Sequence, residues 1–334
     1  MELKIKYKLA FLGILVVFVA ILHLFFGSIH IPFYSVFDVL LFPNSTSSAY
    51  HDVIWWVRLP RMLTALLAGA ALSLAGLQMQ TLFRNPLAGP DVLGLTSGAG
   101  LGVAISIFLS PLLLVIKGFN PIFAFTGAFF VMLIILPIAK MIKDNNSLLV
   151  IGIMLSAIAS SCVGILQYIS DANDVQSYLM WTFGKMGGLS FFEVFIIGIG
   201  LLVGLLLAFI NSRQMNVWVL GESYLTNLQF NIAKARMTMI LSTCLLTGVV
   251  TAYCGPIAFV GLVSPLLVRN WLKTYNHQWL IIGACLGGSI CLLVCDLFIN
   301  IFSSQVSIPI NVATSLFGAP VVIFFIFKLK RLSI

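Results

Sequence analysis

The chain has 334 residues, of which 60% are hydrophobic and only 8% are charged. Soluble domains carry about a quarter charged residues, so this composition excludes a soluble globular protein and indicates a polytopic membrane protein. A net charge of +8 would suggest a nucleic-acid partner for a soluble protein. In a membrane protein it is typical of cytoplasmic Lys and Arg beside the lipid, so we expect lipid contact and no nucleic-acid binding.

Apolar runs long enough to cross a bilayer recur along the whole chain. The first follows Lys4, Lys6 and Lys8 as in a signal peptide, but it is long and has no A-x-A site after it, so we interpret it as a retained helix. The third and eighth runs are short and interrupted by Gly or Pro. The expected spans are 9–29, 62–83, 92–110, 119–140, 148–169, 191–211, 237–254, 257–272, 279–302 and 309–328.

The positive charges orient these spans. Ten spans place both termini on one side. If that side is the cytoplasm, only Arg58, Arg61, Lys117 and Lys185 of the 18 Lys and Arg residues lie outside. The positive-inside rule favours this topology. The sequence therefore predicts an all-α membrane protein with ten transmembrane helices and both termini in the cytoplasm.

Three loops between the spans stand out. Residues 30–57 form a long outer loop, and 170–190 are expected to hold a short surface helix on the same side. The longest inner loop, 212–236, has an amphipathic pattern.

The two halves of the chain share a sequence pattern. RMLTALLAGAALSLAGLQMQ begins at Arg61 and RMTMILSTCLLTGVVTAYCG begins at Arg236, and each leads into a Gly-Pro, at 89–90 and at 255–256. In the expected topology the two copies cross the membrane in opposite directions. Such an inverted repeat with broken segments is typical of transporters, and a chance similarity of two helices rich in small residues is the alternative. We describe the chain as one permease domain, 1–334, with halves of about 1–170 and 171–334.

Residues suited to catalysis or metal binding are scarce in the sequence. The six cysteines all lie in apolar runs. Cys291 and Cys295 share a helix face and could pair on a metal, but small packing thiols are the favoured interpretation. Because the chain has neither a nucleophile–base–acid pattern nor a Walker A motif, we expect no enzyme, no ATPase site and no bound metal.

Residues 58–102 resemble the signature of the FecCD-type permeases, the membrane subunits of ABC importers for iron-siderophores, haem and vitamin B12. LGESYLTNL (220–228), GPIAFVGLVSP (255–265) and IPINVATSLFGAP (308–320) are similar to the family's other signature segments. The resemblance implies a ten-helix subunit of a homodimer in the bacterial inner membrane. It also implies two cytoplasmic ATPase subunits, which bind ATP and Mg, and a substrate-binding protein outside. This chain then needs no cofactor.

The resemblance gives Arg58 and Arg61 a role, because arginines at these positions of the family receive acidic residues of the binding protein. An exposed arginine presents a planar fork to carboxylates and speeds encounter; snorkelling at a helix end is the alternative. The family often has a third outer arginine four residues after an aspartate. Here Asp296 is followed by Asn300, so we expect two arginines to carry most of the docking charge. For Asp296 itself we expect a structural hydrogen bond to a neighbouring helix.

The inner loop VLGESYLTNLQFNI resembles the family's coupling helices, which contact the ATPase. We expect Gly221 to allow a sharp turn and Glu222 to begin the second short helix. Tyr224, Leu225 and Leu228 would form its apolar docking face. An amphipathic helix lying on the lipid surface is the alternative.

A second inner segment, KDNNSLLVIG (143–152), matches the family's cytoplasmic gate by position. Asn145, Asn146 and Ser147 supply the small polar side chains that narrow the exit in the family. An ordinary polar turn is the alternative.

Several polar residues lie in or beside the expected spans. The polar groups of Gln78, Gln80, Asn85 and Ser97 could line the transport cavity, but we expect hydrogen bonds between helices and name none of them as a substrate ligand. The family's usual Pro-His is Pro265-Leu266 here, so no role is carried over for that histidine.

The expected function is ATP-driven import of an iron chelate. Haem or vitamin B12 import by the same type of importer is the alternative, and an ion-coupled secondary transporter is the alternative of another class.

Overall fold

Every element of the computed structural model is a helix over the residues that it describes, which are 2–27, 29, 31–41, 49–109, 120–142, 144–221, 231–302 and 308–332. The elements are α1 (Glu2–Phe25), α2 (Phe33–Leu41), α3 (Ala49–Asp52), η1 (Val53–Arg58), α4 (Leu59–Leu82), η2 (Pro90–Leu93), α5 (Leu95–Phe108), α7 (Asn120–Met141), α8 (Asn145–Tyr168), α9 (Ala172–Thr182), α10 (Phe191–Ile210), α11 (Ser212–Trp218), α13 (Ile232–Cys254), α14 (Val260–Leu272), α15 (His277–Phe302) and α16 (Ile310–Leu332).

Each of the ten expected spans coincides with an apolar helix. Within the described residues, eight helices are long and apolar enough to cross a membrane: α1, α4 with the turns before it, α7, α8, α10, α13, α15 and α16. The other two, α5 and α14, have 14 and 13 residues and match the short third and eighth spans. The short surface helix expected within 170–190 is also present, as α9, with Asp171 at its N-cap.

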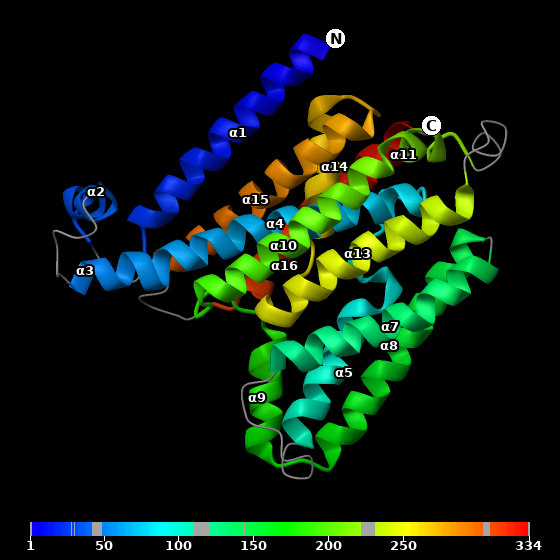
Figure 1. Ribbon diagram of the computed structural model, residues 1–334, viewed down its shortest axis with the longest axis horizontal. Helices are drawn as coiled ribbons and strands as arrows, with labels where there is room; N and C mark the ends of the chain where they lie inside the picture. The colour runs from blue at the N-terminus through cyan, green and yellow to red at the C-terminus, as the bar shows by residue number, and fades with distance from the viewer. Residues whose placement is uncertain are drawn as a thin grey trace.

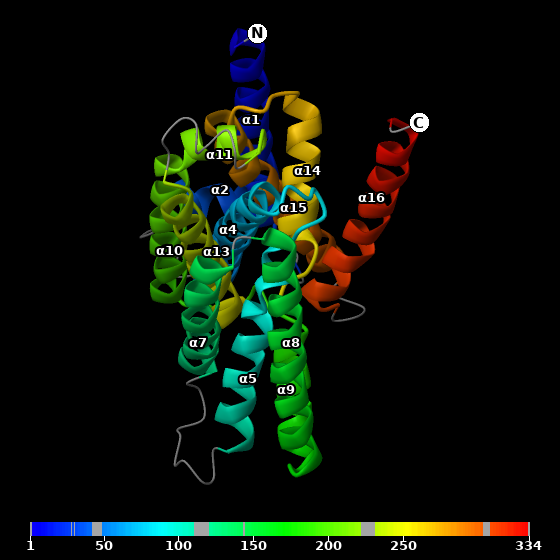
Figure 2. The ribbon, with the colours of Figure 1, turned by 90° about the vertical axis from the view of Figure 1, so that its right-hand side faces the viewer.

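The helices surround α4, which has the most buried apolar window of the eight. It packs against α10, α13, α14 and α15 (Figure 1). Helices α5, α7, α8 and α9 form a group at the lower part of the molecule in Figure 1 and Figure 2. Helix α16 lies at the side of the molecule and packs against α14 and α15 (Figure 2). The start of α1 and the last turn of α16 lie toward the same end, which we call the termini end; the opposite end is the far end.

Glycines set the distance between α4 and its neighbours. A Cβ placed on Gly69 would lie 2.3 Å from the carbonyl oxygen of Gly288 in α15. A Cβ on Gly76 would lie 1.6 Å from the carbonyl oxygen of Gly261 in α14. Small residues allow such close backbone approach, which is how helices associate where the lipid is as apolar as the side chains.

The two Gly-Pro breaks produce related contacts in the two halves. α4 packs against α14, the broken segment of the second half. α13 packs against η2 and α5, the broken segment of the first half. The amide nitrogen of Gln80 donates to the carbonyl of Leu262 at 2.9 Å, across one of these contacts. Each half thus packs its long buried helix against the broken segment of the other half.

The segment before α4 differs from the loop expected at 30–57. It contains α2, α3 and the π-helical turn η1, which runs directly into α4. Pro60 lacks an N–H and its ring collides with the preceding turn of a regular α-helix. The wider π-helical turn before it relieves this collision and keeps the helix continuous. Arg58 and Arg61 therefore lie inside a helix that runs over 50–82 rather than at its start.

Candidate functional site

Arg58 is not the exposed side chain that docking requires. It is only 6% exposed. Its Nη1 donates to the carbonyls of Leu24 at 2.6 Å and Phe25 at 3.0 Å, and its Nη2 donates to the carbonyl of Ile29. The carbonyls of Leu24 and Phe25 lie in the last turn of α1, where a helix leaves its last acceptors unpaired and favours a cation, and Ile29 lies just beyond it. Arg58 thus caps α1, so the expectation of an exposed fork at this position is wrong.

Arg61 forms a two-bond pair with Asp296. Its Nε and Nη2 donate to the two carboxylate oxygens at 2.8 and 2.7 Å. The Arg61 side chain is 25% exposed and that of Asp296 is 1% exposed, so the pair has one buried and one partly open member. The structural hydrogen bond that we expected for Asp296 is therefore present, and Arg61 of α4 makes it.

His23 and Asn300 complete this buried cluster. His23 Nε2 lies 2.7 Å from Oδ2 of Asp296, the oxygen that also accepts from Arg61 Nε, and 3.2 Å from the amide nitrogen of Asn300. The cluster joins α1, α4 and α15 near the far end. Asn300, at the position of the family's third arginine, is buried within it and only 6% exposed. Sequence reasoning missed His23, although an ionisable side chain inside an apolar run is a signal for a specific partner.

At the other end of α4, the carbonyl of Leu82 accepts two side-chain hydrogen bonds. The amide nitrogen of Asn145 donates to it at 2.9 Å and the indole nitrogen of Trp218 donates to it at 3.1 Å. Arg236 lies 5.8 Å from the ring of Trp218 and donates to the carbonyl of Ile142 at 2.7 Å. This network, which we call the Leu82 junction, ties α4, α7, α8, α11 and α13 together.

The three expected gate residues divide into two kinds. Asn145 is buried in the Leu82 junction, whereas Asn146 and Ser147 are exposed. Asp144 caps α8 by accepting from the backbone N–H groups of Asn146 at 3.2 Å and Ser147 at 2.9 Å. The Ser147 hydroxyl, which donates to Asp144 at 2.8 Å, the two backbone donors and nearby Arg236 hold the Asp144 pKa below its usual value.

Only the first residue of the expected coupling segment lies in the described part of the chain. Gly221 is buried, has a φ of +121° and donates its N–H to the carbonyl of Trp218. That backbone region favours glycine, in agreement with the expected sharp turn. Glu222, Tyr224, Leu225 and Leu228 lie outside the described residues.

The polar residues of α4 bind other helices, as expected. The amide of Gln78 donates to the hydroxyl of Ser242 in α13 at 2.9 Å, and Gln80 bonds α14 as described above. Asn85, for which we expected a bond between helices, instead accepts from the N–H of Leu87 within the turn after α4. Among the described His, Cys, Asp and Glu side chains, no three are grouped to hold a metal ion.

Ser97 instead lines a pocket of about 360 Å³ between α5, α8 and α9. All of the residues that line it are uncharged: they are Thr96, Ser97, Gly100, Ser160, Val163, Gln167, Tyr178, Trp181, Thr182 and Pro256. Hydroxyl, amide and aromatic groups can hydrogen-bond and stack with a polar organic molecule. Sequence reasoning did not find this pocket, because its lining residues come from four separate stretches of the chain.

The model of the FecCD transport family matches residues 14–328. The chain belongs to the FecCD transport family. This FecCD permease is 33% identical over 324 residues to the hemin transport system permease HmuU of Yersinia pestis, covering 96% of each chain. It is 33% identical over 300 residues to the vitamin B12 import permease BtuC of Citrobacter koseri, covering 88% of this chain and 89% of BtuC.

A solved structure described as a metal-chelate type ABC transporter in an inward-facing conformation has the same fold as the FecCD permease. The TM-score is 0.82 and the identity 30%, over 97% of this chain and 99% of that one. The chain is thus a permease of the type II ABC importers, and this assignment replaces the alternative of an ion-coupled secondary transporter.

Proposed function

We propose that this FecCD permease carries an iron chelate of the siderophore class across the bacterial inner membrane. The likeness to a metal-chelate type transporter over 97% of the chain is the observation that carries this proposal. The uncharged pocket between α5, α8 and α9 supports it, because a chelate that encloses its metal presents oxygen, nitrogen and ring surfaces rather than a bare ion.

The proposed assembly contains two copies of this chain, two ATPase subunits and one binding protein. Each copy would have ten spans and cytoplasmic termini. The shared position of the two chain ends supports this topology (Figure 2). So does the positive-inside rule, since Lys4, Lys6 and Lys8 begin the chain at that end. The far end then faces outward and the Leu82 junction lies toward the cytoplasm.

The Leu82 junction gives the proposed coupling a physical route. The segment 222–230, where we place the ATPase contact, lies between Trp218 and Arg236 in the sequence. Trp218 shares the Leu82 carbonyl with Asn145 at the start of α8, and Arg236 binds the end of α7. A displacement of the segment would therefore reach α7 and α8, and the gate residues Asn146 and Ser147 lie in the first turn of α8.

Docking of the binding protein is assigned to Arg61 rather than Arg58. Arg58 uses its donors on α1, whereas Arg61 keeps Nη1 outside its two bonds to Asp296 and remains partly exposed. Nearby, Arg61 Cδ lies 3.7 Å from where a Cβ of Gly187 would stand. The same loop carries exposed Lys185, which adds a second outer cation.

Haem is the second candidate substrate, because HmuU matches 96% of this chain. An uptake assay tests the substrate in liposomes that contain the permease, its ATPase and its binding protein. The substrates offered separately are a ⁵⁵Fe-labelled hydroxamate or catecholate siderophore, haem, and vitamin B12. We expect ATP-dependent uptake of a siderophore. Uptake of haem or vitamin B12 instead of a siderophore would overturn the proposed substrate class. Uptake without the ATPase would overturn the proposed ATP-driven mechanism.

A further inference from the structure

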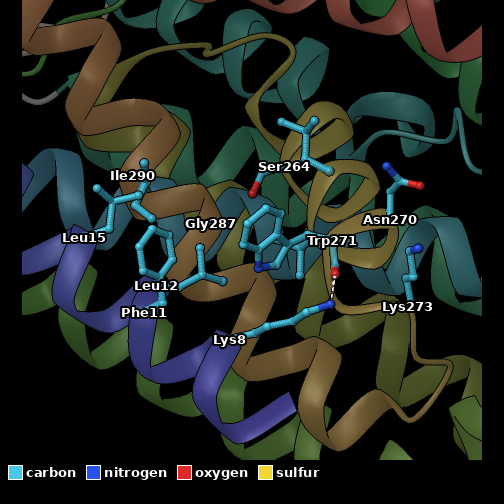
Figure 3. Close-up of a pocket in the computed structure, with 12 residues that line it drawn as sticks. Lys8, Phe11, Leu12, Leu15, Ser264, Asn270, Trp271, Lys273, Gly287 and Ile290 are labelled. Atoms are coloured by element: carbon cyan, nitrogen blue, oxygen red, sulfur yellow. Dashed lines mark hydrogen bonds between the residues drawn. The ribbon is translucent and has the colours of Figure 1, made fainter. Parts of the chain in front are cut away.

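A pocket of about 590 Å³ opens between α1, α14 and α15 toward the termini end. Its wall is mostly apolar and includes Phe11 and Leu15 of α1 and Ile290 of α15 (Figure 3). Val268 of α14 also lines it. The pocket is separate from the uncharged one between α5, α8 and α9. Neither the transport pathway nor the docking surface proposed above uses it.

Two lysines stand at one end of this pocket, on either side of Trp271. Lys8 Nζ donates to the carbonyl of Trp271 at 2.6 Å and lies 5.8 Å from its ring centroid, and Lys273 follows the end of α14 (Figure 3). A lysine ammonium has three donors, so this bond leaves two of them for another acceptor. The residues that line the pocket include no acidic side chain, so the lining carries net positive charge.

The aromatic side chains place this end of the pocket at a membrane interface. Trp271 is 50% exposed and stacks on Phe11, with ring centroids 6.2 Å apart and planes at 27°. Tryptophan is enriched where hydrocarbon meets headgroups, and lysines beside it extend toward the headgroup level. From Lys8 to Leu15 the helix rises about 10 Å, so the apolar wall continues into the hydrocarbon.

We propose that this pocket binds an anionic phospholipid of the leaflet at the termini end. Its phosphate lies between Lys8 and Lys273, and an acyl chain follows the wall formed by Phe11, Leu15 and Ile290. The charge complementarity selects a headgroup with net negative charge, because basic pockets between helices are the sites that bind such headgroups. The apolar wall selects a lipid over a free phosphate ion.

Native mass spectrometry of the full chain in detergent tests this site, with phosphatidylglycerol and phosphatidylcholine as the two probes. We compare the parent with the double variant Lys8→Gln, Lys273→Gln. The matched control Lys6→Gln, Lys140→Gln removes the same charge from exposed positions outside the pocket. Each lysine near an anionic headgroup is worth about fivefold in affinity. We therefore expect the double variant to bind phosphatidylglycerol roughly 25-fold more weakly and the control to bind it like the parent.

Lys273→Gln alone keeps the bond from Lys8 to Trp271, so α14 remains capped, and should weaken phosphatidylglycerol binding about fivefold. Gel filtration of every variant checks that it is folded and monodisperse. Equal binding of phosphatidylglycerol by the parent and the double variant would overturn the proposal. An equal loss in the control, or a parent that binds phosphatidylcholine as tightly as phosphatidylglycerol, would overturn it as well.

Discussion

Each half of the chain carries Arg-Met within a long buried helix, yet the two arginines have different kinds of partner. Arg61 of α4 binds the buried carboxylate of Asp296 with two donors. Arg236 of α13 binds the backbone carbonyl of Ile142, where α7 ends, and lies over Trp218. In the first half the arginine pairs with a carboxylate, and in the second half it binds a backbone carbonyl at the end of a helix.

The two arginines share a position in the sequence pattern but not a partner. Both helices keep a long cationic side chain at the same point, but its partner depends on which neighbouring helix packs there. The energetic consequences also differ. Removing one member of a buried ion pair leaves an uncompensated charge, whereas removing a donor from a helix end leaves a neutral carbonyl.

The largest effect is expected at the charge pair. Arg61→Gln leaves the buried carboxylate of Asp296 without its guanidinium and should lower the free energy of unfolding by about 3–5 kcal/mol. The double variant Asp296→Asn, Arg61→Gln replaces the ion pair with neutral groups and should recover most of this loss. Unfolding in mixed micelles, followed by circular dichroism, measures both. If the single variant is as stable as the parent, breaking the ion pair costs no free energy of unfolding and the prediction is wrong.

Arg236→Gln should have a smaller effect, a loss of about 2 kcal/mol, because it removes charge-assisted bonds to a backbone carbonyl. Arg236→Lys keeps the cation near Trp218 and should lose less. The same titration measures both variants. If Arg236→Gln is as costly as Arg61→Gln, the two regions do not differ as their partners suggest.

Docking should separate Arg61 from Arg58. The double variant Arg61→Gln, Asp296→Asn keeps a neutral pair but lacks the outer cation, so affinity for the binding protein should fall about tenfold at low salt and less at high salt. Lys185→Glu should act in the same direction. Surface plasmon resonance with the permease in nanodiscs measures both. The assignment fails if Arg58→Gln, in a folded preparation, weakens docking while these variants do not.

The smallest effect is expected at Asp144, where the cap of α8 is exposed. Its pKa is lower in the folded state, so the stability it contributes is present above the unfolded pKa of about 3.9 and is lost as the pH falls through the folded value. Asp144→Asn should therefore be less stable than the parent at neutral pH and equally stable well below pH 4. Melting temperatures of the parent and the variant across this pH range measure the difference in stability. A difference that persists in acid would show that the carboxylate is not its cause.

Much of the fold follows from apolar patterning alone. Each predicted span coincides with a helix, and the two shortest follow Gly-Pro breaks. The bonds from Gln78 and Gln80 to other helices were predicted correctly, because a polar side chain inside a membrane helix needs a partner.

The site was less predictable, because its partners are distant in the sequence. Arg58 binds carbonyls about 30 residues earlier, and hydropathy does not reveal that the end of α1 lies against the start of α4. The same holds for His23 and Asp296, which are 273 residues apart. Position and charge treat Arg58 and Arg61 alike, and only the packed helices distinguish a buried cap from a partly exposed pair.

The contacts of Gly76 with Gly261 and of Gly69 with Gly288 determine how the permease can move. Sliding α4 past its neighbours by one residue, about 1.5 Å, would bring a side chain where the backbones touch. Gly98 and Gly127 impose the same restriction on α5 and α7, since a Cβ on Gly127 would lie 2.2 Å from the carbonyl oxygen of Gly98. These contacts resist sliding of α4 against α14 and α15 and of α5 against α7, so we expect a change of shape to rotate each group of helices rather than shear the helices within it.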